Sequence, residues 1–419
     1  MKAVESMLKY LEEQNLQKAK AQFEIIKSAG SDEDKYNAAL ELARFGYLEE
    51  AKELYEHILK NYNDDGEIIV SIAELLVELD REDEAYQYLS MVKPDDPNYP
   101  AALLLEADLY EMQGLYEVSE NKLKQAKQML PHEPVIDYAL AELFLTQGRF
   151  LEASRIFKEL LDAKEFTVGD VDINSRMAEA LSAGGAFEEA LVYYENALKN
   201  KKEINVLFGY GLTSYQSGNY KKAIDAFTEL REIDPEYHSL YLYLAHSFEH
   251  EERLEEALDT VVAGMKVDEF NKELYHYAGK LALKLGNEED GENYLRQAIV
   301  LDPEFTEAGL TLNKLLLHQE RYEDVLEISK MFSDGVGDDA QFHWDAALSY
   351  QNLEQYSLAL NEYEVAYNEV NNNNEFLKDY GYFLLEEGRR SEATIIFKKL
   401  KENDPTNEEW ISILERLEE

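Results

Sequence analysis

The sequence predicts an all-α solenoid, in which helix pairs stack one upon the next, and three observations support this prediction. A small residue recurs about every 34 positions, a second small residue lies twelve positions before it, and a large apolar residue lies four positions after it. Twelve such units follow one another from about residue 1 to residue 407. One match could arise by chance, but twelve in near-register cannot. Repeats of this kind contact mainly their neighbours and present an extended surface.

We call the recurring small residue the anchor of its unit. The anchors are Ala19, Ala51, Ala85, Ser119, Ala153, Ala190, Ala223, Ala257, Gly291, Val325, Ala359 and Ala393. The column twelve positions earlier is Met7, Ala39, Ala73, Ala107, Ala141, Ala178, Gly211, Ala245, Gly279, Asn313, Ala347 and Gly381. The column four positions later is Phe23, Tyr55, Leu89, Leu123, Phe157, Tyr194, Phe227, Val261, Leu295, Ser329, Tyr363 and Phe397. The small columns let paired helices approach closely, and the large residue fills the space beside the crossing, one turn along the same face.

Each unit is predicted to hold two helices separated by a turn. Around Ala223, apolar residues recur three and four apart before Gly218, as a half-buried helix requires. Gly218 suits the left-handed conformation that ends a helix, and Asn219 can cap the next one. The second helix is expected to end near Asp234, because a residue before proline is pushed out of the α region. The prolines at this stop position are Pro97, Pro131, Pro235, Pro303 and Pro405.

The tenth unit departs most from the pattern. Its three columns hold Asn313, Val325 and Ser329, and the sequence SDGVGDD at 333–339 follows it. Because two of these residues are polar where other units have small or large apolar ones, we expect locally loose packing in this unit.

A longer step between two anchors suggests a division of the chain. The fifth and sixth anchors are 37 residues apart, so the segment KEFTVGDVDINS holds about three extra residues and is a candidate bend. We therefore expect repeats 1–5 in residues 1–167 and repeats 6–12 in residues 168–407. Residues 408–419 are expected to form a capping helix that covers the last apolar face with Trp410, Ile413 and Leu414.

A 34-residue helix–turn–helix unit with these small residues, an aromatic and a terminal proline resembles the tetratricopeptide repeat. The resemblance covers essentially the whole chain. It implies a right-handed superhelix in which the first helix of each pair lines a concave groove. The carboxylate-clamp members of this family use a set of Lys, Asn and Arg across adjacent first helices. That set is not found here, so a receptor for chaperone C-terminal tails is not supported.

Composition narrows the classes of partner and location. The chain has 41 Lys+Arg against 87 Asp+Glu, spread over its whole length, and a net charge of −46. Nucleic acids and anionic lipids would be repelled at long range, because affinity for nucleic acid comes largely from neutralising phosphates. The N-terminal stretch MKAVESMLKYLEEQ lacks the apolar run of a secretory signal, and no segment approaches the roughly 18–20 apolar residues of a membrane span. We expect a cytoplasmic protein, and the residue usage leans towards a bacterial one.

The sequence offers no sign of catalysis or of a cofactor. It contains no cysteine, no phosphate-binding glycine loop, no nucleophile elbow and no His-Glu-x-x-His motif. His246 and His250 lie four apart on one helical face and could bind zinc if a third ligand converged on them. The simpler interpretation is that both histidines line the groove. We expect neither an enzyme nor a metal or cofactor site.

One column of the predicted first helices contains the candidate binding residues. Positions 15, 11 and 8 before each anchor are spaced four and three apart, so they share a face. The middle position is, unit by unit, Leu8, Leu40, Glu74, Asp108, Glu142, Glu179, Leu212, His246, Lys280, Lys314, Leu348 and Tyr382. Four consecutive acids are thus followed, after one leucine, by three residues that can be basic.

The predicted binding residues form three groups. The acidic group in repeats 3–6 is Glu74, Asp108, Glu142 and Glu179. The basic group in repeats 8–10 is His246, His250, His276, Lys280, Lys284, Lys314 and His318. The aromatic group near the changeover is Tyr138, Phe208 and Tyr215. Aromatic side chains of this kind often anchor a partner.

Several functions fit this pattern. The acidic group would attract a Lys- or Arg-bearing segment and the basic group a carboxylate or phosphate, which favours a scaffold or adaptor that binds a protein segment. The column could instead reflect the acidic composition alone, or the two groups could pair with each other in self-association. Other interpretations are a regulatory sensor of a small peptide or anion near Lys280 and Lys314, and an envelope or complex assembly factor.

Overall fold

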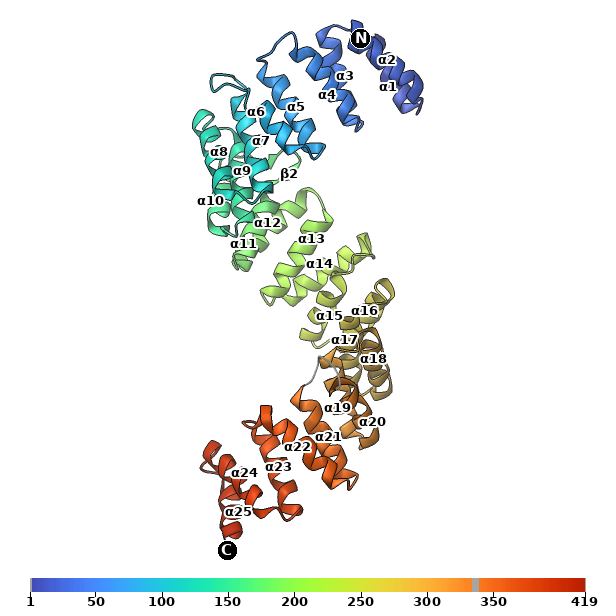
Figure 1. The fold of residues 1–419 in the computed structure, drawn as a ribbon, viewed down its shortest axis with the longest axis vertical. Helices are drawn as coiled ribbons and strands as arrows, with labels where there is room; N and C mark the ends of the chain where they lie inside the picture. The colour runs from blue at the N-terminus through green and yellow to red at the C-terminus, as the bar shows by residue number, and fades with distance from the viewer. Residues whose placement is uncertain (1, 334–338, 419) are drawn as a thin grey trace. The chain divides into compact units, whose positions relative to one another are not determined.

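The computed structural model describes residues 2–333 and 339–418 of the 419-residue chain. Over these residues the chain forms 25 α-helices and one short two-stranded hairpin, so the all-α prediction is confirmed (Figure 1). The chain divides into two compact units, Met1–Gly209 and Tyr210–Glu419, which are described separately below.

The first unit contains the following elements, with α13 extending across its boundary. They are α1 (Lys2–Glu12), α2 (Leu16–Ala29), α3 (Asp32–Arg44), α4 (Leu48–Leu59), α5 (Gly66–Glu78), α6 (Glu82–Leu89), α7 (Tyr99–Met112), α8 (Tyr116–Met129), α9 (Pro134–Thr146), α10 (Phe150–Asp162), β1 (Thr167–Val168), β2 (Val171–Asp172), α11 (Ile173–Ala183), α12 (Phe187–Asn200) and α13 (Ile204–Gln216).

The second unit continues the same alternation of first and second helices. Its elements are α14 (Tyr220–Ile233), α15 (Leu240–His250), α16 (Leu254–Val267), α17 (Lys272–Lys284), α18 (Glu288–Leu301), α19 (Thr306–His318), α20 (Tyr322–Ser333), α21 (Ala340–Asn352), α22 (Tyr356–Val370), α23 (Asn374–Glu386), α24 (Arg390–Asn403) and α25 (Glu408–Glu418).

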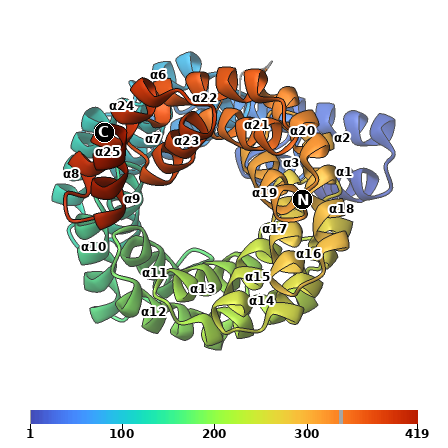
Figure 2. The same cartoon turned by 90° about the horizontal axis from the view of Figure 1, so that it is seen from below.

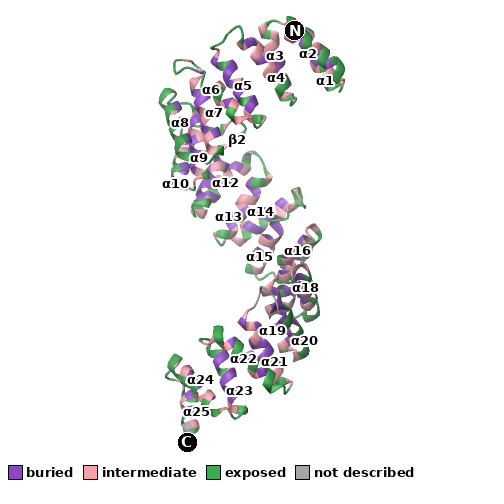
Figure 3. Ribbon diagram, in the orientation of Figure 1, coloured by how far each residue is buried: buried purple, intermediate pink, exposed green. Residues whose placement is uncertain are grey.

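All three predicted columns lie in the core, where the helices of a pair face each other (Figure 3). In the ninth repeat both small positions are glycine. A Cβ atom on Gly279 would lie 2.7 Å from the Leu295 side chain and 3.2 Å from the carbonyl oxygen of Gly291. A side chain at either glycine would therefore push the two helices apart, which explains the small columns.

The predicted helix ends around Ala223 are also confirmed. Gly218 has φ +76°, and α14 begins at Tyr220 with Asn219 as the preceding cap residue. The Asn219 side chain makes no capping hydrogen bond, so its predicted contribution to the cap is wrong. The second helix ends at Ile233, one residue before Asp234, as expected from Pro235.

The prediction of loose packing in the tenth unit is wrong for its described residues. Asn313, Val325 and Ser329 are all buried, like their counterparts in other units. The Asn313 amide Nδ2 donates to Ser329 Oγ at 2.9 Å and to Asp345 Oδ2 at 3.2 Å. The Asn313 amide nitrogen thus links the two helices of the pair, while its carbonyl oxygen Oδ1 is buried without a hydrogen-bond partner among the described residues. The rest of the prediction concerns residues 334–338, which lie outside the described residues.

The extra residues of the long unit form a hairpin that the sequence did not indicate. Strands β1 and β2 pair antiparallel, with Thr167 opposite Asp172 and Val168 opposite Val171. The division predicted after residue 167 lies in this hairpin and stays a prediction.

The capping helix is confirmed as α25. Its Trp410, Ile413 and Leu414 are buried in the C-terminal core cluster, and the Trp410 ring lies 5.8 Å from that of Phe397. No helix within the described ranges has the length and hydropathy needed to span a bilayer.

Candidate binding surfaces

First helices lie on the inner side of the curve of each unit. In the first unit α7, α9 and α11 lie inside α8, α10 and α12, and in the second unit α15, α17 and α19 lie inside α16, α18 and α20 (Figure 2). The predicted acidic group is on α5, α7, α9 and α11, each acid directly after a buried small residue. Since successive residues of a helix point about 100° apart, each acid projects away from the core contact.

Three of the four acids meet at one concavity. Glu74, Asp108 and Glu142, from three successive repeats, line a pocket of about 400 Å³ together with Glu111. We call this the acidic pocket. Its other lining residues are Ala101, Leu104, Leu105, Val135, Tyr138 and Ala139. The pocket therefore combines several carboxylates with apolar walls and one aromatic ring.

The electrostatics of the acidic pocket favour a cation. Withdrawal from water, with Glu111 nearby, raises the pKa of Asp108 to about 6. The same desolvation, with Glu78 nearby, raises the pKa of Glu74. Within the described part of the chain, neither carboxylate has an ion-pair partner. A cation beside either carboxylate would therefore offset its repulsion from the neighbouring acid and part of its desolvation cost.

The acids of repeats 5 and 6 already share a cation from the chain itself. Arg176 on α11 donates through Nε to Glu142 Oε1 at 2.8 Å, and its two terminal nitrogens donate to Glu142 and Glu179. Burial raises the pKa of Glu179, and the Arg176 charge opposes that rise. The acidic group thus divides into an internally paired half and an open half.

The residues of the aromatic group lie on two helices, α9 and α13, and belong to both units. Tyr138 lines the acidic pocket, with its ring 6.3 Å from that of Phe157. Phe208 is half-buried on α13 in the first unit. Tyr215 belongs to the second unit, where its ring lies 6.3 Å from the ring of His246. Each residue stays a separate candidate contact.

Two histidines of the basic group lie against tyrosines, and His276 lies against Phe305. The rings of His246 and Tyr277 are 4.2 Å apart, and those of His250 and Tyr220 are stacked at 4.1 Å. Burial lowers the pKa of His246 and of His276, so both imidazoles are neutral at neutral pH. The described residues contain no group of three or more His, Asp or Glu side chains placed to hold a metal ion.

Of the three lysines in the basic group, one is in an ion pair and two have no such partner among the described residues. Lys284 pairs with Glu249, which also accepts a hydrogen bond from the Tyr277 hydroxyl at 2.5 Å. His276 Nε2 lies 3.1 Å from Thr311 Oγ1. By contrast, Lys280 and Lys314 are exposed and, among the described residues, have no ion-pair partner. His318 is exposed at the end of α19.

Comparison with known proteins fits the repeat pattern. Models described as YpiA-like tetratricopeptide repeats match residues 111–165 and 340–407, and general tetratricopeptide-repeat models match residues 42–109, 204–237 and 273–305. The TPR repeat-containing protein YpiA of Bacillus subtilis (strain 168) is 42% identical over 388 residues, covering 93% of this chain and 92% of that protein. The chain belongs to the YpiA-like family of tetratricopeptide-repeat proteins. Proteins built from this repeat generally mediate protein–protein interactions.

Two solved structures align with this chain at low sequence identity. The APC/C hetero-tetramer Cut9-Hcn1 aligns with 99% of this chain and 95% of that one, at 14% identity and a TM-score of 0.39. YrrB, described as a TPR protein with an unusual peptide-binding site, aligns with 44% of this chain and 95% of that one, at 16% identity and a TM-score of 0.39.

The repeat pattern in the sequence indicated the column of acids but did not indicate Arg176, which pairs with two of them. Arg176 lies one position outside the predicted stripe, three residues before Glu179. Its contact with Glu142 joins residues 34 apart in sequence. That spacing is three residues short of the 37-residue step between the fifth and sixth anchors, so the contact does not join equivalent positions and the repeat pattern did not indicate it.

Proposed function

We propose that this protein is a non-enzymatic scaffold or adaptor that binds a Lys- or Arg-bearing protein segment in the acidic pocket. The supporting observation is that carboxylates from three successive repeats line one concavity with apolar walls. Such a surface suits an extended segment, because a basic side chain can reach the carboxylates while its neighbours contact Leu104, Leu105 and Val135. Tyr138 offers a rigid aromatic contact at the same place.

The contact made by Arg176 supports this choice of ligand chemistry. In repeats 5 and 6 one guanidinium bridges two acids of the column. Glu74 and Asp108 hold the same column positions in repeats 3 and 4 without an internal cation. A guanidinium or ammonium from a partner would play the same part there, with affinity that falls as salt screens the charges.

The test uses a defined peptide and two matched double variants. A fluorescein-labelled ten-residue peptide with two arginines and two leucines is titrated by anisotropy against the wild type, Glu74→Gln/Asp108→Asn and Glu255→Gln/Asp259→Asn. The last variant removes the same charge from exposed positions on α16. We expect at least tenfold weaker binding for the pocket variant only. Equal weakening in both variants would leave net charge as the explanation and refute the pocket.

A second candidate function rests on the unpaired lysines of the second unit. Lys280 and Lys314 would bind a carboxylate or phosphate, either on the same partner or as a small regulatory ligand. Isothermal titration with inorganic phosphate and with an acidic peptide, on wild type and Lys280→Gln/Lys314→Gln, tests this. Binding that survives the double substitution would exclude these lysines.

The net charge of the chain bears on the class of partner that we propose. A net charge of −46 disfavours nucleic acid as the partner and favours basic proteins of the cytoplasm. Self-association, with the acidic group of one copy on the basic group of another, is the alternative. Sedimentation at two salt concentrations tests it, because such a dimer would dissociate as salt rises.

A further inference from the structure

A set of arginines ties neighbouring repeats together on their second helices. These residues lie four positions before the anchor and are Arg81, Arg149, Arg253, Arg321 and Arg389. Each pairs with the acid three residues later, which is Glu84, Glu152, Glu256, Asp324 or Glu392 respectively. Four of them also reach an acid on the preceding second helix: Arg81–Glu49 at 2.8 Å, Arg149–Glu120 at 2.7 Å, Arg321–Glu292 at 2.5 Å and Arg389–Glu364 at 3.6 Å. We call this arrangement the arginine clamp.

The second repeat has the geometry of the clamp without the arginine. Tyr47 holds the clamp position, with φ −87° and ψ 63°, close to the φ −86° and ψ 57° of Arg149. Glu50 follows three residues later, where the five arginine-bearing units have the paired acid, and within the described residues it has no ion-pair partner. Lys20 occupies the position that Glu120 holds in the fourth repeat. A site that elsewhere holds a guanidinium is thus left without one.

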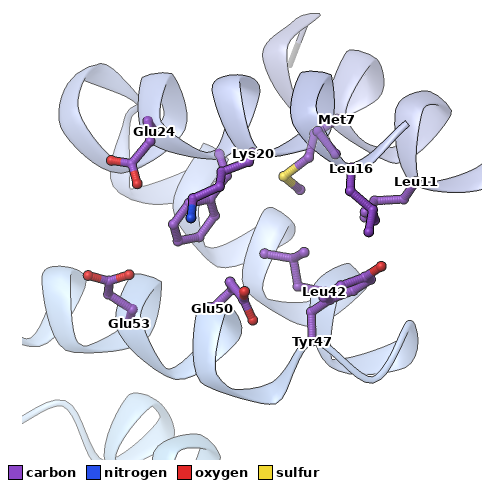
Figure 4. A pocket seen from close by; sticks show the side chains of 11 residues that line it. Met7, Leu11, Leu16, Lys20, Glu24, Leu42, Tyr47, Glu50 and Glu53 are labelled. Carbon is purple, nitrogen blue, oxygen red and sulfur yellow. The ribbon is translucent and has the colours of Figure 1, made fainter. Parts of the chain in front are cut away.

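A pocket opens at this place. It has a volume of about 300 Å³ and lies between α2 and α4, over α1 and α3 (Figure 4). We call it the N-terminal pocket. Its apolar lining is Met7, Leu11, Leu16, Ala19, Phe23, Leu42 and Tyr47, and its charged lining is Lys20, Glu24, Glu50 and Glu53. Glu53 is already paired with Lys27, whereas Glu24 and Glu50 face the opening.

The clamp also shows how a cation sits on such a surface. The Arg149 guanidinium lies 3.9 Å from the centre of the Phe144 ring, and that of Arg253 lies 4.6 Å from the Phe248 ring. Both rings are nine positions before the anchor, where the second repeat has Leu42 at the pocket wall. The apolar support for a guanidinium is therefore present beside Glu50.

We propose that the N-terminal pocket docks a partner segment in which a large apolar side chain adjoins an arginine or lysine. The apolar side chain enters between Leu16, Phe23 and Leu42. The cation reaches Glu50, with Glu24 at the rim, and supplies the clamp that the second repeat lacks. Leu16, which is 58% exposed, loses its contact with water in the complex. This site is separate from the acidic pocket and does not depend on the function proposed for it.

The test selects peptides on the whole protein and then asks what they recognise. A displayed library of random 12-residue peptides is selected on the wild type, and the enriched peptides are titrated against Tyr47→Arg and Tyr47→Phe. Tyr47→Arg gives the second repeat its own clamp arginine, on a backbone that already suits one. We expect a class of peptides with an apolar residue next to Arg or Lys, bound at least tenfold more weakly by Tyr47→Arg and equally by Tyr47→Phe.

A third variant distinguishes a partner segment that carries Arg or Lys from one that carries Asp or Glu. Lys20→Glu makes the second clamp position acidic, as Glu120 and Glu292 are. It should strengthen binding of the selected peptides several-fold, whereas a site that recognises carboxylates through Lys20 would lose its ligand. Hydrogen exchange over α2 and α4 checks that each variant is folded and that Tyr47→Arg increases protection there. The proposal is overturned if no enriched peptide distinguishes Tyr47→Arg from wild type, or if those that do are rich in Asp and Glu.

Discussion

Replacing Asp345 by asparagine should stabilise the tenth and eleventh repeats at alkaline pH. Asp345 is 4% exposed and accepts hydrogen bonds from Asn313 Nδ2 and, at 2.8 Å, from Gln341 Nε2. Burial raises its pKa from 3.8 to about 6, despite these hydrogen bonds, and Asp339 adds to the rise. The native state therefore holds a proton at this site more tightly than the unfolded chain does.

The sign and size of the effect follow from that difference in pKa. The stability contributed by a raised carboxyl pKa is fully present below the unfolded value and is lost as pH rises through the native value. The span from 3.8 to about 6 corresponds to about 3 kcal/mol of destabilisation in the ionised state. Asp345→Asn removes the charge and keeps the shape, but it leaves one acceptor oxygen where the carboxylate has two. The gain should therefore appear above pH 6, stay smaller than this destabilisation and vanish near pH 4.

Hydrogen exchange of peptides from α19 and α21 measures this locally, which suits a repeat protein whose parts open separately. Exchange is followed at several pH values for the wild type, Asp345→Asn and the exposed control Asp259→Asn. A variant that is less stable than wild type at every pH would show that the hydrogen bonds to the carboxylate outweigh its desolvation, and would refute the reasoning.

Three further predictions concern the acidic pocket, the acids paired with Arg176 and the core. Binding of the arginine peptide to the acidic pocket should weaken by up to about tenfold per pH unit below pH 6, because the cation must displace the proton from Asp108. Anisotropy titrations should show no such pH dependence for Glu74→Gln/Asp108→Asn. Arg176→Gln should leave Glu142 and Glu179 without their shared cation, so the same peptide should bind more tightly. Urea unfolding should show that the free energy of unfolding falls by about 1 kcal/mol. Unchanged affinity would exclude these two acids from the site. Gly279→Ala should cost about 1–3 kcal/mol in urea unfolding, because its Cβ would lie 2.7 Å from Leu295, and a neutral result would mean that the helix pair shifts freely.

The helix pairs could be predicted because steric contact is repeated in the sequence. The position that Ala223 holds in its repeat must be small in nearly every unit, so the column of small residues can be recognised from the sequence alone. The polar tenth unit misled the prediction, since Asn313 and Ser329 look unsuited to a core when each is considered alone. Their mutual hydrogen bond depends on which residues face each other across the pair.

The site was predicted less completely because it depends on contacts between repeats and on burial. The column of acids was visible, but the pairing by Arg176 joins two different units. The charge of His246 depends on how far its ring is withdrawn from water, which composition does not reveal. Tyr47 lines the N-terminal pocket, and its significance is visible only by comparison with the arginines at the same position in five other repeats.

The polar residues Asn313, Ser329 and Asp345 also help to fix the order in which the repeats stack. Twelve helix pairs with nearly the same apolar faces could stack in a wrong order during folding with little loss of buried area. The Asn313–Ser329 hydrogen bond lies within the tenth pair, but the bond from Asn313 to Asp345 joins that pair to the eleventh. A tenth pair placed beside any other partner would lose this bond, at a cost of about 1–3 kcal/mol. Assembly in the correct order is therefore favoured most strongly at the point where the sequence departs furthest from its own consensus.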